Sequence, residues 1–196
     1  MKKPSNWNDV KAAGERVKLP AGGYEAKIIN AKVVSYDGSN GSYERLEIAV
    51  DITAGEYKDY YKQDFDSNTR DDKKWRGVAR FYVPTDDGSE KDEYTKSVLK
   101  SVTDALEGSN KDYHWDWDET SLKGLKVGIL VRDKEYEVDG KHGFSPEIFR
   151  FTDINRIKEG KFTVPKQKLL KESSGTSAAA SSGSDSAASS DDDYPF

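Results

Sequence analysis

The sequence predicts a mainly β fold, specifically an OB-fold, a five-stranded Greek-key barrel with one helix between strands three and four. Three observations support this prediction: several segments have the two-residue period of strands, one has the period of a helix, and their order is informative. Three strands, a helix and two more strands is the order found in an OB-fold. An α+β sheet covered by one helix remains the alternative, because it uses the same elements.

Three strands are expected in the first half of the chain. The first follows a break at Gly22 and Gly23, and the third stops at Pro84, a residue that cannot continue a strand ladder. A long polar segment, residues 55–74, separates the second strand from the third. Apolar and polar residues alternate imperfectly in the first strand and clearly in the second, which is the pattern of a half-buried strand. The three strands are expected over residues 24–34, 46–53 and 78–83.

One helix is expected after the third strand, and its sequence contains start, face and stop signals. It begins at the polar run 86–89 and ends near Gly108, where a C-terminal cap belongs. The opposite face is charged, so the helix packs on one side only. Its apolar face is formed by residues that recur every fourth position, namely Tyr94, Val98, Val102 and Leu106.

The last two strands are expected over residues 125–131 and from residue 148 to 151. Between them, residues 136–141 contain the pair Asp139-Gly140, which favours a tight hairpin turn. The predicted domain organisation is therefore an N-terminal arm over 1–21, an OB-fold domain over 22–165, a linker over 166–190 and an acidic tip over 191–196. Ser173 to Ser190 has too few apolar groups to offset its ordering entropy, so we expect disorder there.

Charge is distributed unevenly along the 196 residues, which include 31 basic and 36 acidic side chains and have a formal net charge of −5. From Ser173 to Phe196 there are four aspartates and no lysine, arginine or glutamate. The rest of the chain is therefore nearly neutral, with all 31 basic residues and 32 acidic ones. The acidic net charge does not argue against a nucleic-acid partner, because local clustering of cations decides such binding.

Several functional classes find little support in the sequence. The absence of cysteine excludes disulfides, thiolate zinc sites and cysteine nucleophiles. His114 and His142 lie in separate predicted loops without a metal-ligand or catalytic pattern. The chain has no phosphate-cradling glycine motif, and we expect no enzyme activity, metal or cofactor. We also expect no signal peptide or membrane span, which suits a cytoplasmic protein.

Aromatic and basic residues interleave between the second and third predicted strands, as single-strand binding requires. Strand 78–83 adds two more candidates, and Tyr136 lies between Lys134 and Lys141 in the predicted hairpin. Of Phe81 and Tyr82, one must face the core and the other solvent. The predicted single-stranded DNA contacts are Tyr57, Lys58, Tyr60, Tyr61, Lys62, Phe65, Arg70, Lys73, Lys74, Trp75, Arg76, Arg80, Tyr82 and Tyr136.

Each of these assignments has a structural alternative. The aromatic residues of segment 57–65 could pack onto the body of the protein, because tyrosine and tryptophan are often partly buried. The cations could form an ordinary solvated surface, since aspartates are mixed among them. Tyr136 could belong to a cross-strand aromatic pair. A second aromatic segment, residues 113–119, carries three carboxylates, so we expect it to close one end of the barrel rather than to contact DNA.

The final six residues, Asp191-Asp192-Asp193-Tyr194-Pro195-Phe196, combine an acidic run with an aromatic end. This hexapeptide resembles the acidic tip of bacterial and phage single-stranded DNA-binding proteins, with Tyr194 at the position where that family usually has isoleucine. The resemblance implies that the tip recruits replication or repair proteins and competes with DNA for the protein's own groove. The opening segment 19–24 also resembles that of small phage replication and recombination accessory proteins.

We therefore expect a sequence-independent single-stranded DNA-binding protein of replication and recombination, encoded by a phage or mobile element and active in a bacterial cytoplasm. Its partners would be single-stranded DNA and replication proteins, with no membrane, and it would be a monomer or a dimer. A protein–protein adaptor that binds no DNA is the alternative. A metal-dependent nuclease using Asp116, Asp118 and Glu119 is a more distant one.

Overall fold

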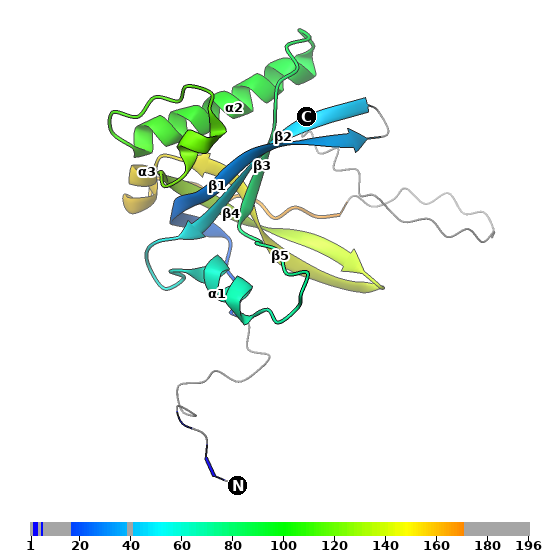
Figure 1. Ribbon diagram of the computed structural model, residues 1–196, viewed down its shortest axis with the longest axis vertical. Helices are drawn as coiled ribbons and strands as arrows, with labels where there is room; N and C mark the ends of the chain where they lie inside the picture. Colours follow the sequence, from blue (N-terminus) through cyan, green and yellow to red (C-terminus); the bar gives the residue numbers. More distant parts are fainter. Residues whose placement is uncertain (1, 4, 6–16, 39–40, 171–196) are drawn as a thin grey trace, which may run out of the picture.

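Five antiparallel strands form one open sheet in the order β3-β2-β1-β4-β5 (Figure 1). The structure, a computed structural model, describes residues 2–3, 5, 17–38 and 41–170. Most of the predicted arm and linker and the whole acidic tip lie outside these residues. The strands are β1 (Gly22–Gly38), β2 (Gly41–Ile52), β3 (Val78–Tyr82), β4 (Lys126–Val138) and β5 (Lys141–Thr152).

All five predicted strands are present, and four of them extend beyond their predicted ends. β1 and β2 form one long hairpin, and β4 and β5 form another. In Figure 1 the tips of both hairpins project from the same side of the molecule. The predicted turn at Asp139-Gly140 is confirmed, and both residues have the positive φ angles, 52° and 71°, of a tight hairpin turn.

The long helix α2 (Glu90–Ser109) lies between β3 and β4, as the order of elements predicted. Its first turn is capped by Ser89, whose side chain accepts a hydrogen bond from the Asp92 backbone N–H. The predicted stop at Gly108 is wrong, because the helix continues to Ser109 and Asn110 caps it. The Asn110 amide donates to the Leu106 carbonyl and accepts from the Lys126 N–H, which ties the helix end to β4.

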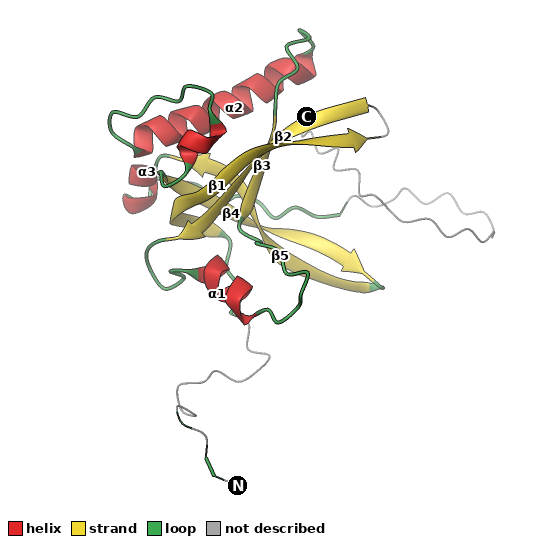
Figure 2. Ribbon diagram, in the orientation of Figure 1, coloured by secondary structure: helices red, strands yellow, loops and turns green. Residues whose placement is uncertain are grey.

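The expectation of a single helix is wrong. Three short helical segments also occur: α1 (Tyr60–Ser67), η1 (Glu119–Leu122) and α3 (Ile154–Lys158). Figure 2 shows α2 and α1 on opposite sides of the sheet. Among the helices of the described residues, none combines the length and apolar character that a membrane crossing requires.

A cap from a distant strand starts α1. The Asp51 carboxylate, at the end of β2, accepts hydrogen bonds from the N–H groups of Ile52, Tyr61 and Lys62 at 2.9, 3.0 and 3.2 Å. Two of these donors belong to the first turn of α1, where backbone N–H groups lack helical partners. Burial raises the pKa of Asp51, although these three hydrogen bonds favour its charged form. Asp51 therefore performs from β2 the role that a local N-cap residue usually has.

The core lies between the inner face of the sheet and α2. The rings of Phe81 on β3 and Phe151 on β5 meet edge to face, with their centroids 5.2 Å apart. Leu19 is fully buried in the same core, so the folded body begins before the predicted boundary at residue 22. The Leu19 N–H donates to the Tyr60 hydroxyl at 3.3 Å. The last residues of the predicted arm, around Leu19, are thus part of the folded body.

The described chain ends alongside β4. The Glu135 N–H donates to the Lys168 carbonyl at 2.8 Å, and the Lys168 N–H donates to the Asp133 carbonyl at 2.8 Å. These bonds form a parallel bridge on the half of β4 that β1 does not reach. Residues 166–170, which were expected to belong to the linker, therefore include a segment that is paired with the sheet.

Candidate nucleic-acid interface

Three tyrosines from three adjacent strands form a row on the outer face of the sheet. Tyr36 on β1 lies opposite Tyr43 on β2, with ring centroids 5.5 Å apart and an interplanar angle of 16°. The Tyr43 ring lies 5.5 Å from the ring of Tyr82 on β3. We call Tyr36, Tyr43 and Tyr82 the tyrosine row.

Arg45 links the members of this row. Its guanidinium carbon lies 5.4 Å from the ring centre of Tyr36, 5.0 Å from Tyr43 and 4.7 Å from Tyr82. All three distances are within the range of a cation–π interaction. The Arg45 Nη2 also donates to the Tyr82 hydroxyl at 2.8 Å. One cation thus holds three rings in a fixed relation.

The two-residue period of the strands places these side chains on one face. On β2, Leu46 and Ile48 are buried, and Tyr43 and Arg45 lie at odd numbers of residues from them, so these two side chains point outward. On β3, Phe81 is buried at 6% exposure and Tyr82 is half-buried. The prediction that one of these two aromatics faces the core and the other the outer face is confirmed.

Glu47 organises the polar part of this face. Its carboxylate accepts from the Tyr36 hydroxyl at 2.6 Å and from the Arg80 Nε at 3.0 Å, and Lys32 lies 3.8 Å away. Burial favours the neutral carboxyl, but the hydrogen bonds and neighbouring cations outweigh it, and the pKa of Glu47 is lowered. The same hydrogen bond raises the pKa of Tyr36. Tyr36 therefore stays a neutral donor, and Glu47 stays an anion.

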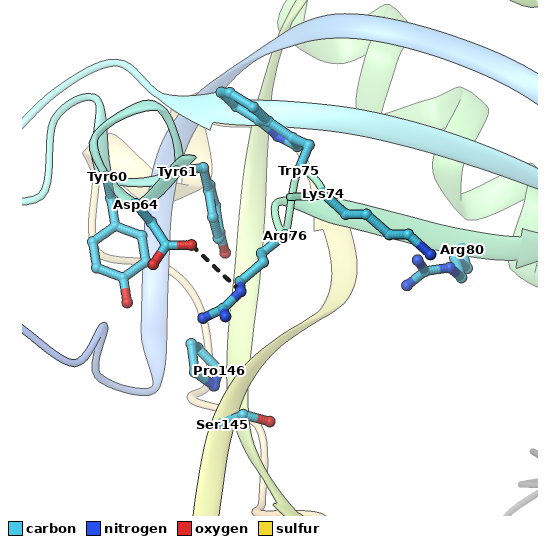
Figure 3. Close-up of a pocket in the computed structure, with 9 residues that line it drawn as sticks. All are labelled: Tyr60, Tyr61, Asp64, Lys74, Trp75, Arg76, Arg80, Ser145 and Pro146. Atoms are coloured by element: carbon cyan, nitrogen blue, oxygen red, sulfur yellow. Dashed lines mark ion pairs between the residues drawn. The ribbon is translucent and has the colours of Figure 1, made fainter. Parts of the chain in front are cut away.

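A groove of about 450 Å³ lies between α1, the segment before β3 and the edge of β5 (Figure 3). Three cations line it, Lys74, Arg76 and Arg80, against one carboxylate, Asp64, whose Oδ2 lies 3.5 Å from the Arg76 Nε. Arg80 also contacts Glu47, so the groove adjoins the tyrosine row. The complete lining is Tyr60, Tyr61, Asp64, Lys74, Trp75, Arg76, Arg80, Ser145 and Pro146.

Most of the aromatic residues predicted to contact DNA before β3 pack against the core of the protein. The ring of Tyr61 is buried at 3% exposure, so its assignment as a base-stacking residue is wrong. A Cβ added at Gly77 would meet this ring at 2.5 Å, which shows how closely the two pack. Tyr57 and Tyr60 pack against the core, and the Trp75 Nε1 donates to the Val50 carbonyl at 3.0 Å.

The remaining predicted residues before β3 are distributed around α1. The Phe65 and Trp75 ring centroids are 5.8 Å apart, and the Lys73 ammonium nitrogen lies 4.5 Å from the centre of the Phe65 ring. Lys58, Lys62 and Arg70 are exposed, and Lys62 pairs with Asp66. The alternative, in which the aromatics of segment 57–65 pack onto the body, therefore holds for most of them.

Tyr136 lies in the β4–β5 hairpin, away from the groove lining, and is 43% exposed. It is paired with Gly143, and a Cβ at that glycine would meet the tyrosine hydroxyl at 2.6 Å. The expected alternative, a cross-strand aromatic pair, is thus absent at this position. A glycine opposite leaves room for the ring to lie across β5.

Three residues of the interface were missed in the sequence analysis: Tyr36, Tyr43 and Arg45. Segment 36–41 was assigned to a turn, and the second strand was begun at residue 46. A signal was available, because Tyr43, Arg45 and Glu47 continue the alternation of β2 toward the hairpin tip. Extending the second strand by this rule would have placed Tyr43, Arg45 and Glu47 on the same face of the sheet as Tyr82.

The acidic aromatic segment lies elsewhere. In Figure 1 the loop between α2 and η1 is on the side of the body away from the two hairpin tips. Trp115 packs against the core, and its Nε1 donates to the Asp118 carbonyl at 3.1 Å. The Trp117 ring is tilted against the Trp115 ring, with centroids 4.9 Å apart, but Trp117 is 70% exposed, so the predicted structural role fits only Trp115.

Within the described part of the chain, no group of three or more histidine or acidic residues is arranged to hold a metal ion. His142 lies between Glu135 and Glu137, at 3.9 and 3.7 Å. Comparison with protein-family models gives no match, and no curated protein matches the chain. The interface is therefore interpreted from its own geometry.

Proposed function

We propose that the protein binds single-stranded DNA without sequence preference, in replication or recombination, and that it is not an enzyme. The tyrosine row with Arg45 is the observation that supports this function most directly. Rings on a sheet face provide surfaces on which unpaired bases stack, and the adjoining cations of the groove neutralise phosphates. A duplex hides its bases, so this combination favours single strands.

The hydrogen bonds of the row support binding without sequence preference. The Tyr36 hydroxyl donates to Glu47, and the Tyr82 hydroxyl accepts from Arg45. These groups are thus engaged within the protein, and the faces of the rings remain the main contribution to a bound base. Every base has a face that stacks, whereas sequence is read through hydrogen bonds to base edges.

We further infer that the sheet is of the OB type. The strand order, the position of α2 and the contact between Phe81 and Phe151, which brings β3 near β5, agree with that fold. In OB-folds the face of strands two and three and the loops between strands one and two and between four and five bind nucleic acid. On this inference, the tyrosine row and the two projecting hairpins correspond to those elements.

A titration of a fluorescent oligo-dT at several salt concentrations tests the DNA function. Each phosphate contact on a single strand contributes about −0.7 to the slope of log K against log salt, so three groove cations predict a slope of about −2. Oligo-dC should bind within a few-fold of oligo-dT, and a duplex of equal length should bind more weakly. Failure to bind any single strand at low salt would refute the proposal.

The acidic tip lies outside the described residues, and its role stays a proposal: it recruits replication or repair proteins. Replacing Phe196 with alanine keeps every charge but removes the one side chain of the tip that buries most readily. We expect this variant to lose the replication proteins that the full chain retains in a pull-down from bacterial extract. As a control, the Phe196→Ala variant should bind oligo-dT with the same affinity as the full chain. Equal retention of those proteins would mean that the tip serves only solubility.

An adaptor function is the second candidate, and Trp117 is the observation that favours it. A tryptophan with 70% exposure is unusual, and its neighbours Asp116 and Asp118 are exposed acids. A partner segment with a lysine or arginine beside an apolar residue would complement this surface. If Trp117→Ala abolished partner binding while no single strand bound, the adaptor function would replace the first proposal.

A further inference from the structure

The Tyr61 hydroxyl is a buried polar group without a hydrogen-bond partner among the described residues. Its ring is packed beneath Gly77 at 3% exposure, so the side chain has no room to turn elsewhere. Leaving such a group unpaired reduces stability, and a phenylalanine would fill the same space without this cost. A hydroxyl that is unpaired, held at a fixed position and part of a groove lining is a hydrogen-bond donor that a bound ligand can use.

The surroundings of this hydroxyl indicate which ligand fits. Tyr61 lines the groove, and in Figure 3 its hydroxyl end is on the side where Arg76 and Asp64 form their ion pair. Lys74, Arg76 and Arg80 outnumber the one carboxylate of the lining, so the groove attracts anions. Burial strongly raises the pKa of Tyr61, so the hydroxyl keeps its proton and can donate.

We propose that this groove holds one phosphodiester group of the bound strand, with the Tyr61 hydroxyl donating to a phosphate oxygen and Arg76 supplying the positive charge. The inference rests on the proposed single-strand binding. Arg76 can take this role because its side chain is 58% exposed and its Nε lies 3.5 Å from the Asp64 Oδ2, which is longer than a normal hydrogen bond. Arg80 connects the groove with the tyrosine row, so one strand can pass from the rings into it.

The decisive variant is Tyr61→Phe, which removes only the hydroxyl. We expect the Kd for oligo-dT to rise about tenfold, as for a hydrogen bond to a charged group. The salt slope should stay unchanged, because no charge is lost. The melting temperature should not fall, because an unpaired buried group is removed. Tyr113→Phe, whose hydroxyl bonds Ser121 on the far side, is the matched control and should leave the Kd unchanged.

A double-mutant cycle with Arg76→Gln tests whether both groups contact the same phosphate. If they do, the double variant should lose less affinity than the product of the two single losses. An oligo-dT with neutral methylphosphonate linkages keeps one P=O acceptor at each linkage but loses its charge, so the difference in Kd between wild type and Tyr61→Phe should shrink on this strand. A difference of the same size on the neutral strand would assign the hydroxyl to a base or sugar and overturn the inference.

The two proposals fail separately. If wild-type protein binds no oligo-dT, the DNA function is wrong, and this inference with it. If wild-type protein binds oligo-dT and Tyr61→Phe binds with the same Kd, only the phosphate site is wrong. The remaining interface then needs no contribution from Tyr61.

Discussion

Replacing Asp51 with alanine should lower the free energy of unfolding by about 3 kcal/mol, because several backbone N–H groups lose their charged acceptor in a buried place. The donors are those of Ile52, Tyr61 and Lys62, at 2.9, 3.0 and 3.2 Å. Two of them begin α1, so the helix that carries one wall of the groove should loosen first. Urea unfolding measures the total loss, and hydrogen exchange of the α1 amides locates it.

Asp51→Asn is the matched control, because it keeps the shape and one acceptor oxygen. We expect it to retain more of the stability than the alanine variant does. The raised pKa gives a second readout. A carboxyl whose pKa is higher in the folded state adds stability that is fully present below its unfolded pKa, and this is lost as pH rises through the folded pKa. The free energy of unfolding of wild type should therefore rise relative to that of Asp51→Asn as pH falls from the folded pKa to the unfolded pKa of Asp51. A constant difference would contradict the assignment.

Replacing Arg45 with alanine should weaken oligo-dT binding by roughly 2 kcal/mol, about 30-fold, the size of one stacked base. Arg45 lies within 5.4 Å of the ring centres of Tyr36, Tyr43 and Tyr82, so its loss frees all three rings to reorient. The same fluorescence titration measures the change. Thermal unfolding should move little, because the side chain is on the outer face of the sheet.

Arg45→Lys is the discriminating control for this prediction. It keeps the charge but not the planar group that lies against several rings at once, so it should recover only part of the affinity. Lys111→Ala removes an exposed cation beyond the end of α2 and should have no effect. If Arg45→Lys bound oligo-dT as tightly as wild type, only the positive charge of Arg45 would matter for binding. The planar shape of the guanidinium group would then not be needed to hold the tyrosine row.

The sequence predicted the strands and α2 because those elements depend on local periodicity. Apolar alternation in β2 and the four-residue spacing in α2 reflect one buried face each. The short helix α1 was missed because its start depends on Asp51, a residue of the preceding strand. A tertiary cap leaves no local signal in segment 60–67. The extra length of the hairpins was missed because polar and aromatic residues at their tips look like turn residues.

The candidate site was predicted in part, for the same physical reason. Arg80 and Tyr82 were found because β3 is a short strand with a clear period. The aromatic residues around Tyr61 were assigned to DNA from composition, which does not distinguish a ring packed beneath Gly77 from an exposed one. Tyr36 and Arg45 meet only when β1 and β2 pair in the observed register. Register between strands is a tertiary property, and a single sequence specifies it weakly.

The bridge at Lys168 has a practical consequence for shortening the chain. β4 continues past its partner β1, and the outer edge of that half would expose unpaired backbone groups without residues 166–170. Such an edge is a template for pairing with a second molecule. A version without the acidic tip should therefore end after Leu170 and not after Pro165. Otherwise self-association through a bare strand edge could be mistaken for an effect of the missing tip.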